Sequence, residues 1–315
     1  MKQFRILMIT GSKIKKMQID LISPSRSPVG QPLYVVRDDL FPLYYGGNKA
    51  RKMVHIIREI EEGLFDAVVS TGGIQSNHCR VVALACAEKG WKCKLILHGS
   101  REQFFAEKGN ALLMKRSGAL LEFVEGHEIG PAMDCAMQEL EAMGKRPYYL
   151  YGGGHNRPGV LAYKEAMQEF MEAWPLEEAP GDVFLASGTG STQAGLLAGC
   201  RMLGWARTRI RGISVARTKE RGFKSILESL GFADEEAESY QDDIYFEDSY
   251  TFGAYGQYSQ ELEDFTSRMA RETGLILDNT YTGKAFYGML DLISKEQKNA
   301  PLVFWHTGGL LNLMH

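Results

Sequence analysis

The stretch GDVFLASGTGSTQAGLLAGC, residues 181–200, joins two apolar runs through a turn of glycines and hydroxyl side chains. A buried strand, a glycine-rich turn and a helix in that order form the basic unit of a parallel α/β sheet. Free backbone amides at such a helix start, helped by Ser and Thr hydroxyls, bind phosphate groups. The turn therefore predicts a phosphate site, although a plain tight turn would also explain it. The predicted phosphate ligands are Gly188, Thr189, Gly190, Ser191 and Thr192.

Two better-known phosphate motifs fit this turn poorly. A P-loop needs a Lys-Ser or Lys-Thr pair after its glycines, and none follows here. The dinucleotide fingerprint needs a third glycine, and Gln193 occupies that position. A compact phosphate without a dinucleotide is the better match, and a nucleotide-binding α/β protein remains the alternative.

The same alternation of strand-like and helical runs continues over most of the chain from about residue 48. Three further glycine-rich turns follow predicted strands, at residues 70–78, 151–156 and 306–309. In open parallel sheets, ligands bind at the carboxyl ends of the strands, where such turns lie. We therefore expect an α/β fold whose glycine-rich turns share one site. The acidic stretch 221–243 is expected to be a solvated surface segment.

The segment GGNKARK, residues 46–52, places a lysine at the start of a predicted helix. Asn48 can cap that helix, which puts Lys49 in its first turn. The positive end of the helix dipole, together with Arg51 and Lys52, should lower the pKa of Lys49. A neutral lysine is a nucleophile toward aldehydes, whereas the competing interpretation is a solvated surface lysine.

Composition narrows the partners and the location. The 315 residues carry a formal net charge of −3, which gives no basic surface for nucleic acid, so we expect a small-molecule substrate. The five cysteines have no metal-ligand spacing, so we expect no metal and a packed role in a reducing cytoplasm. No apolar stretch is long enough to span a membrane, and the first 17 residues lack a signal-peptide pattern. Met17 offers an alternative start, which would make residues 1–16 an upstream extension.

Five motifs together resemble one enzyme family. GGNKARK, GGIQSNH, GTGSTQAGLLAG, LDNTYTGKAFYGM and FWHTGG occur in the order found in D-cysteine desulfhydrases and 1-aminocyclopropane-1-carboxylate (ACC) deaminases. The resemblance implies the tryptophan-synthase-β-like fold, fold type II of pyridoxal 5′-phosphate (PLP) enzymes, with two open, mostly parallel sheets flanked by helices. It also implies a small domain at 49–158, a large PLP-binding domain that combines 1–48 with 159–315, and a homodimer.

The resemblance also assigns roles to individual residues. Lys49 would hold PLP as a Schiff base and then carry the substrate's α-proton, and the turn at 188–192 would bind the phosphate. Asn77 would bind the cofactor's 3-hydroxyl, and together with Ser76 and His78 it would face the substrate carboxylate. The remaining assignments are Ser76 and Tyr281 as catalytic groups, Thr282 or Thr307 at the pyridine nitrogen, and Tyr255 either facing the substrate or packing as an ordinary aromatic.

One position separates the two branches of the family. ACC deaminases typically carry a glutamate after the tyrosine of the YxGK motif, whereas this chain has the neutral Thr282. A weaker electron sink suits the loss of a good leaving group such as sulfide better than the opening of a cyclopropane. We therefore expect αβ-elimination from a small amino acid such as D-cysteine. ACC deamination, another amino-acid substrate or an idle PLP-binding protein remain alternatives, because Tyr44-Tyr45, AYGQYSQ and GGLLNLMH depart from the family pattern.

Overall fold

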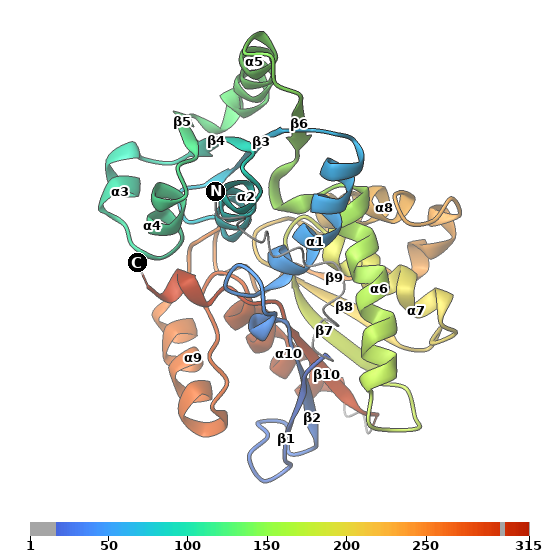
Figure 1. The fold of residues 1–315 in the computed structure, drawn as a ribbon. Coiled ribbons are helices and arrows are strands. Elements are labelled where there is room, and N and C mark those ends of the chain that lie inside the picture. The colour runs from blue at the N-terminus through green and yellow to red at the C-terminus, as the bar shows by residue number, and fades with distance from the viewer. Residues whose placement is uncertain (1–16, 297–299, 315) are drawn as a thin grey trace, which may run out of the picture.

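The computed structural model describes residues 17–296 and 300–314 and contains two sheets. The larger sheet has the strand order β1-β2-β10-β7-β8-β9, and only the β1–β2 pair in it is antiparallel. Its strands are β1 (Ile19–Ile22), β2 (Leu33–Arg37), β7 (Asp182–Ser187), β8 (Arg209–Ser214), β9 (Tyr245–Glu247) and β10 (Leu302–His306). The chain thus contributes to this sheet from both ends, with β2 between β1 and β10 (Figure 1).

The smaller sheet is entirely parallel, in the order β5-β4-β3-β6. Its strands are β3 (Ala67–Gly73), β4 (Lys92–His98), β5 (Leu120–Val124) and β6 (Pro147–Leu150). The two mostly parallel sheets confirm the predicted fold class. The domain boundaries at residues 48/49 and 158/159 stay a prediction.

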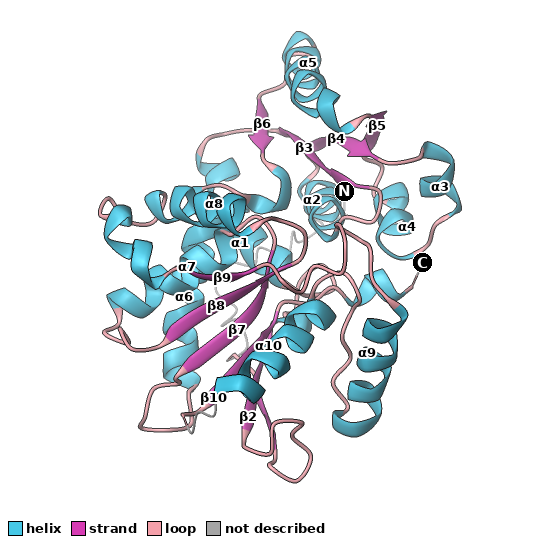
Figure 2. Cartoon of the chain, turned by 180° about the vertical axis from the view of Figure 1, so that it is seen from behind, coloured by secondary structure: helices cyan, strands magenta, loops and turns pink. Residues whose placement is uncertain are grey.

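Helices cover both faces of each sheet (Figure 2). In the smaller sheet, α1 and α2 pack on one face and α5 on the other. In the larger sheet, α6, α7 and α8 pack on one face, and α9 and α10 on the other. The helices are α1 (Asn48–Glu62), α2 (Asn77–Lys89), α3 (Arg101–Ala106), α4 (Gly109–Arg116), α5 (Ile129–Ala142), α6 (Arg157–Ala173), α7 (Ser191–Met202), α8 (Lys219–Gly231), α9 (Gln260–Thr273) and α10 (Thr282–Glu296).

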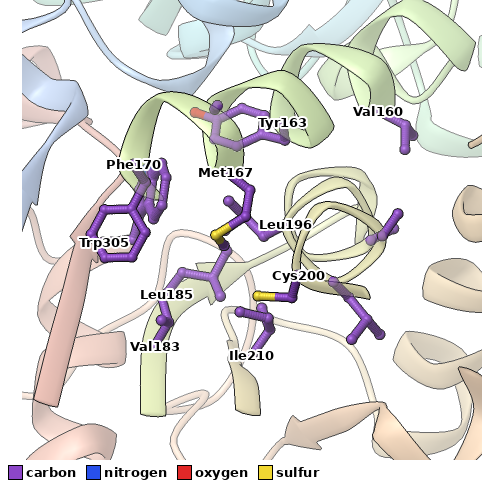
Figure 3. Close-up of a cluster of buried hydrophobic side chains, with 14 of the residues drawn as sticks. Val160, Tyr163, Met167, Phe170, Val183, Leu185, Leu196, Cys200, Ile210 and Trp305 are labelled. Atoms are coloured by element: carbon purple, nitrogen blue, oxygen red, sulfur yellow. The ribbon is translucent and has the colours of Figure 1, made fainter. Parts of the chain in front are cut away.

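The core under α6 and α7 fixes the glycine-rich turn in place (Figure 3). Tyr163, Met167 and Phe170 of α6 are fully buried with Trp305 of β10. Gly195 of α7 lets the two helices touch, since a Cβ there would lie 2.4 Å from the Val160 carbonyl oxygen. This close packing holds the start of α7 at the carboxyl end of β7.

The structure adds to the sequence-based expectations at the first two strands, the acidic stretch and the cysteines. The strands β1 and β2 were not anticipated from the sequence pattern, which we followed only from about residue 48. The acidic stretch 221–243 is not simply a solvated segment, because α8 buries Ile226 and Leu230 in the core beside α7. Four of the five cysteines are buried as expected, whereas Cys135 is exposed.

Within the described ranges, no helix has the length and apolar character needed to cross a membrane. The alternative start at Met17 concerns residues 1–16, which lie outside the described part of the chain.

Candidate active site

A cavity of about 370 Å³ opens where the glycine-rich turns of the two sheets meet. Every predicted site residue except Ser191 and Thr282 lines it. The predicted residues that line it are Lys49, Ser76, Asn77, His78, Gly188, Thr189, Gly190, Thr192, Tyr255, Tyr281 and Thr307. The four turns therefore share one site, as the sequence predicts.

The GGNK turn is held against the HTGG turn by backbone contacts. The Asn48 amide donates to the Thr307 carbonyl oxygen at 2.9 Å, and a Cβ on Gly308 would lie 2.6 Å from the Gly47 Cα. Asn48 is the first helical residue and Gly47 takes the N-cap position, so Asn48 does not cap the helix as predicted. Its side chain instead donates to the Thr192 hydroxyl at 3.2 Å.

Lys49 points its ammonium group at the Gly153 carbonyl oxygen, 3.1 Å away. Burial of this group lowers its pKa to about 8. The predicted direction is therefore found, but desolvation is the cause rather than the helix dipole or the neighbouring cations. Arg51 is neutralised by ion pairs with Asp38 at 2.9 Å and Glu169 at 2.8 Å, so its charge is compensated locally.

Lys52 lies behind the glycine-rich turn before α7, and the sequence assigned it no ligand. It is 1% exposed, and its Nζ donates to the Ser191 hydroxyl at 2.7 Å. No carboxylate in the described ranges pairs with it, and burial, with a smaller effect of Lys49, holds its pKa well below the usual value. Because Lys52 follows Lys49 by three residues on one helix, the two fall on the same face. That spacing was the available signal.

The turn before α7 presents unused backbone amides. Gly190 occupies the N-cap in the left-handed region, at φ +83°, and no side chain caps the helix. Ser191 lies behind this turn, where its hydroxyl meets Lys52 and Thr189 rather than the cavity. Ser187 and Thr71 line the cavity, and each has a buried hydroxyl oxygen without a hydrogen-bond partner among the described residues. A phosphorylated, polar ligand such as PLP fits this set of donors.

The start of α2 offers donors of a different kind. Ser76 is the N-cap of this helix, and its Oγ accepts from the Cys79 amide at 3.1 Å, which leaves its own proton free. The Ser70 hydroxyl must donate to the Leu150 carbonyl oxygen at 2.8 Å, so His78 Nε2 donates to Ser70 across 2.9 Å. Burial also holds the pKa of His78 well below its usual value. The His78 ring is therefore neutral and brings no positive charge to a carboxylate.

Asn110 is a second residue that the sequence did not identify. Its fully buried side chain donates to Asn77 Oδ1 at 3.1 Å and to Asn312 Oδ1 at 2.7 Å. The short helix Leu310–Leu313 is thereby tied to α4 and to a residue that lines the cavity. The contacts of Asn110 span 33 positions to Asn77 and 202 to Asn312, so no local pattern could reveal them.

The tyrosines and threonines of the last motifs divide into two groups. The Tyr281 hydroxyl lies 2.5 Å from that of Tyr255, and burial raises the pKa of Tyr281 well above its usual value. Thr282 faces away from the cavity: its hydroxyl donates to Asp278 Oδ1 at 2.7 Å and accepts from the Asp278 amide at 2.9 Å. Of the two candidates for the pyridine nitrogen, the structure thus leaves Thr307 in the cavity and removes Thr282 from it.

The cavity lining contains no Asp or Glu among the described residues, although it includes the cations Lys49, Arg80 and Arg217. The same ranges hold no group of three or more His, Cys, Asp or Glu side chains that could bind a metal ion. The lining thus suits an anionic ligand.

Comparison with known proteins agrees with this geometry. The family model described as "Pyridoxal-phosphate dependent enzyme" matches residues 20–308. The chain belongs to this family. A relative from Pyrococcus furiosus, provisionally named a 1-aminocyclopropane-1-carboxylate deaminase, is 34% identical over 91% of this chain and 87% of its own. A D-cysteine desulfhydrase from Yersinia enterocolitica is 31% identical over 89% of this chain and 87% of its own. The crystal structure of an ACC deaminase homologue superposes with a TM-score of 0.84 at 31% identity, covering 95% of this chain and 91% of that one.

The family assignment fixes the cofactor and the general type of enzyme. PLP is the cofactor, and the protein is a PLP-dependent enzyme of the ACC deaminase and D-cysteine desulfhydrase type. The substrates of this family are small amino acids. The resemblance predicted from the five motifs is confirmed.

Proposed function

We propose that the protein catalyses αβ-elimination on a small amino acid of the D-cysteine type. With water, one molecule of D-cysteine would give pyruvate, ammonia and sulfide. The observation that supports this proposal best is that no Asp or Glu among the described residues lines the cavity. A carboxylate at the pyridine nitrogen would keep that atom protonated and strengthen the electron sink, as ring opening requires. A neutral Thr307 suffices where sulfide can leave.

The chain's own residues suit the remaining tasks. Lys49 would hold the cofactor and, once freed, accept the α-proton, because a pKa of about 8 leaves part of it neutral near neutral pH. Lys52 and the amides at the start of α7 would hold the phosphate, with Asn77 at the cofactor ring. Ser76 would donate its free proton to the substrate. When bound, PLP withdraws electrons from the substrate's α-carbon.

Tyr281 and Tyr255 would close the substrate side of the cavity. Tyr281 immediately precedes α10, Tyr255 lies in the loop before α9, and both line the same cavity as the start of α2. With a raised pKa, Tyr281 keeps its proton and would serve as a hydrogen-bond donor. We also propose that the protein is a homodimer and that it is located in the cytoplasm. Light scattering on the purified protein would test the oligomeric state.

A substrate panel on the purified holoenzyme tests the proposal. D-cysteine, L-cysteine and ACC would be compared for release of pyruvate, sulfide and 2-oxobutyrate. Pyruvate and sulfide from a cysteine enantiomer would support elimination, whereas 2-oxobutyrate from ACC would assign the deaminase reaction instead. A holoprotein that retains PLP but releases neither product would be an idle binder. Lys49→Ala should abolish both turnover and the absorbance band of the lysine-bound cofactor.

A further inference from the structure

Arg80 is a buried cation in the wall of the cavity. It lies one helical turn after Ser76, is only 3% exposed and lines the same space. Its Nη2 donates to the Gly46 carbonyl oxygen at 3.4 Å, and its buried Nε has no hydrogen-bond partner in the described part of the chain. Burial lowers its pKa to about 10, which still leaves the guanidinium charged at neutral pH.

No carboxylate in the described ranges compensates this charge. Arg51, which is buried to a similar degree, has Asp38 at 2.9 Å and Glu169 at 2.8 Å. Residues 1–16 and 297–299 contain no Asp or Glu, so the rest of the sequence offers no acidic side chain either. An isolated buried charge is strongly unfavourable. The cavity that Arg80 lines is the space from which a counter-ion can reach it.

The cofactor phosphate is the other anion expected in the site, and it already has its own binding groups. The phosphate would bind at the start of α7, where no side chain caps the helix, and Lys52 donates a hydrogen bond to Ser191 of that turn. At the start of α2, Ser76 has a proton to donate, but the neutral His78 supplies no charge. Ser76 is the N-cap of α2 and Arg80 lies in the first turn of that helix, and both residues line the cavity. The unmatched cation and the free donor therefore belong to one subsite.

We propose that Arg80 supplies the positive charge that binds the α-carboxylate of the substrate. The inference rests on the proposed function, because it takes this cavity as the amino-acid site. It makes Arg80 a specificity residue: amino acids with a free carboxylate bind, and their amides or esters bind poorly. Removal of a group that recognises a charged partner typically lowers affinity by tenfold or more.

The test compares alanine with alaninamide, which differ in the carboxylate and lack a β-leaving group. Each is titrated into the holoprotein, with the enantiomer that gives the larger change in cofactor absorbance, and the apparent Kd is read from that change. The proteins are the wild type, Arg80→Gln, Arg80→Lys and, as a matched cavity control, Arg217→Gln. Arg217 also lines the cavity, but unlike Arg80 it interacts electrostatically with a carboxylate, that of Glu228.

In the wild type we expect alanine to bind at least about tenfold more tightly than alaninamide. Arg80→Gln should weaken alanine by about tenfold or more and alaninamide by less than about twofold. Arg80→Lys should retain part of the preference, and Arg217→Gln should retain it. Equal weakening of both ligands, an unchanged preference in Arg80→Gln or its loss only in Arg217→Gln would overturn the inference.

Thermal unfolding separates binding from a structural role. An uncompensated buried charge destabilises the protein, so the ligand-free midpoint of Arg80→Gln should equal or exceed that of the wild type. A clearly lower midpoint would assign Arg80 to the fold and overturn the inference. Failure of the proposed function looks different, because a wild type without PLP absorbance or elimination products fails it whatever Arg80 does. A holoenzyme that eliminates normally but ignores the carboxylate refutes only the role of Arg80.

Discussion

Lys52 Nζ lies 2.7 Å from Ser191 Oγ, and this hydrogen bond joins α1 to the glycine-rich turn before α7. The lysine that anchors the bond is almost fully buried, and no carboxylate within the described ranges pairs with it. Lys52 is therefore a buried cation that could bind an anionic ligand. The contact also explains why α1, which carries Lys49, and α7, which begins at the phosphate turn, meet at one site.

Substitution of Lys52 tests that reading. Lys52→Met keeps the length of the side chain but removes the charge, so we expect at least about a tenfold weaker apparent affinity for PLP. Absorbance titration of cofactor-free protein measures it. Lys89→Met is the matched control, since Lys89 forms a surface ion pair with Glu61 at 2.6 Å. Equal affinities in the two variants would contradict a phosphate-binding role for Lys52.

The lowered pKa of Lys49 predicts how its reactivity depends on pH. Only the neutral amine adds to an aldehyde, and a group with a pKa of about 8 is half neutral at pH 8. The rate at which cofactor-free protein captures PLP should rise about tenfold per pH unit below pH 8 and level off above it. Stopped-flow absorbance gives this profile. An ordinary lysine, with a pKa of about 10.4, would show a rate that still climbs between pH 8 and 10.

Gly308 tests the contact between the HTGG and GGNK turns. Its φ of +93° disfavours other residues, and an added Cβ would lie 2.6 Å from the Gly47 Cα. Gly118, at φ +77° with open space around it, has the same backbone restriction without the contact. We expect Gly308→Ala to lower the free energy of unfolding by about 1–3 kcal/mol more than Gly118→Ala does. Denaturant titration compares them, and equal losses would mean that the turns can separate without cost.

Lys284 should be a structural cation. It is fully buried, and its Nζ donates to the carbonyl oxygens of Val215 at 3.1 Å, Thr251 at 2.6 Å and Ala254 at 3.2 Å. Lys284→Met removes three donors at once, so we expect a loss of about 2 kcal/mol or more in the free energy of unfolding.

Lys295→Met is the control for Lys284, because it removes only an exposed ion pair with Asp291 at 2.6 Å. Its effect should stay within about 1 kcal/mol. Because Ala254 precedes Tyr255, Lys284→Met should also lower turnover, while the exposed variant should not. If the Lys284 variant is as stable and active as the Lys295 variant, the loop that contains Thr251 and Ala254 does not need Lys284 to keep its conformation.

Much of this architecture could be predicted because its signals are local. The runs at 67–73, 182–187 and 302–306 are mostly apolar, and glycines end the first and follow the other two, which identifies them as buried strands that lead into ligand-binding turns. The strand β2, LYVVR, is also apolar, but neither β1 nor β2 ends in a glycine-rich turn. Their place in the sheet depends on pairing with β10, a partner almost 270 residues away in the chain.

The charges of the site could not be predicted in the same way. Sequence placed Lys49 at a helix start and attributed its lowered pKa to the dipole, but the extent of burial decides the shift. Thr282 was a candidate for the cofactor until the structure showed its hydroxyl bound to Asp278. Both outcomes depend on which atoms surround a group, and those atoms come from distant parts of the chain.

The sequence by itself determined the fold class, the order of the turns and the family, because hydrophobic periodicity and residue spacing act over short distances. The tertiary structure alone decided that Arg51 has carboxylate partners, while Lys52 and Arg80 have none within the described ranges. Compensation of a buried charge depends on all its neighbours in space. That difference makes two basic residues, Lys52 on α1 and Arg80 on α2, candidate ligands for the two anions of the active site.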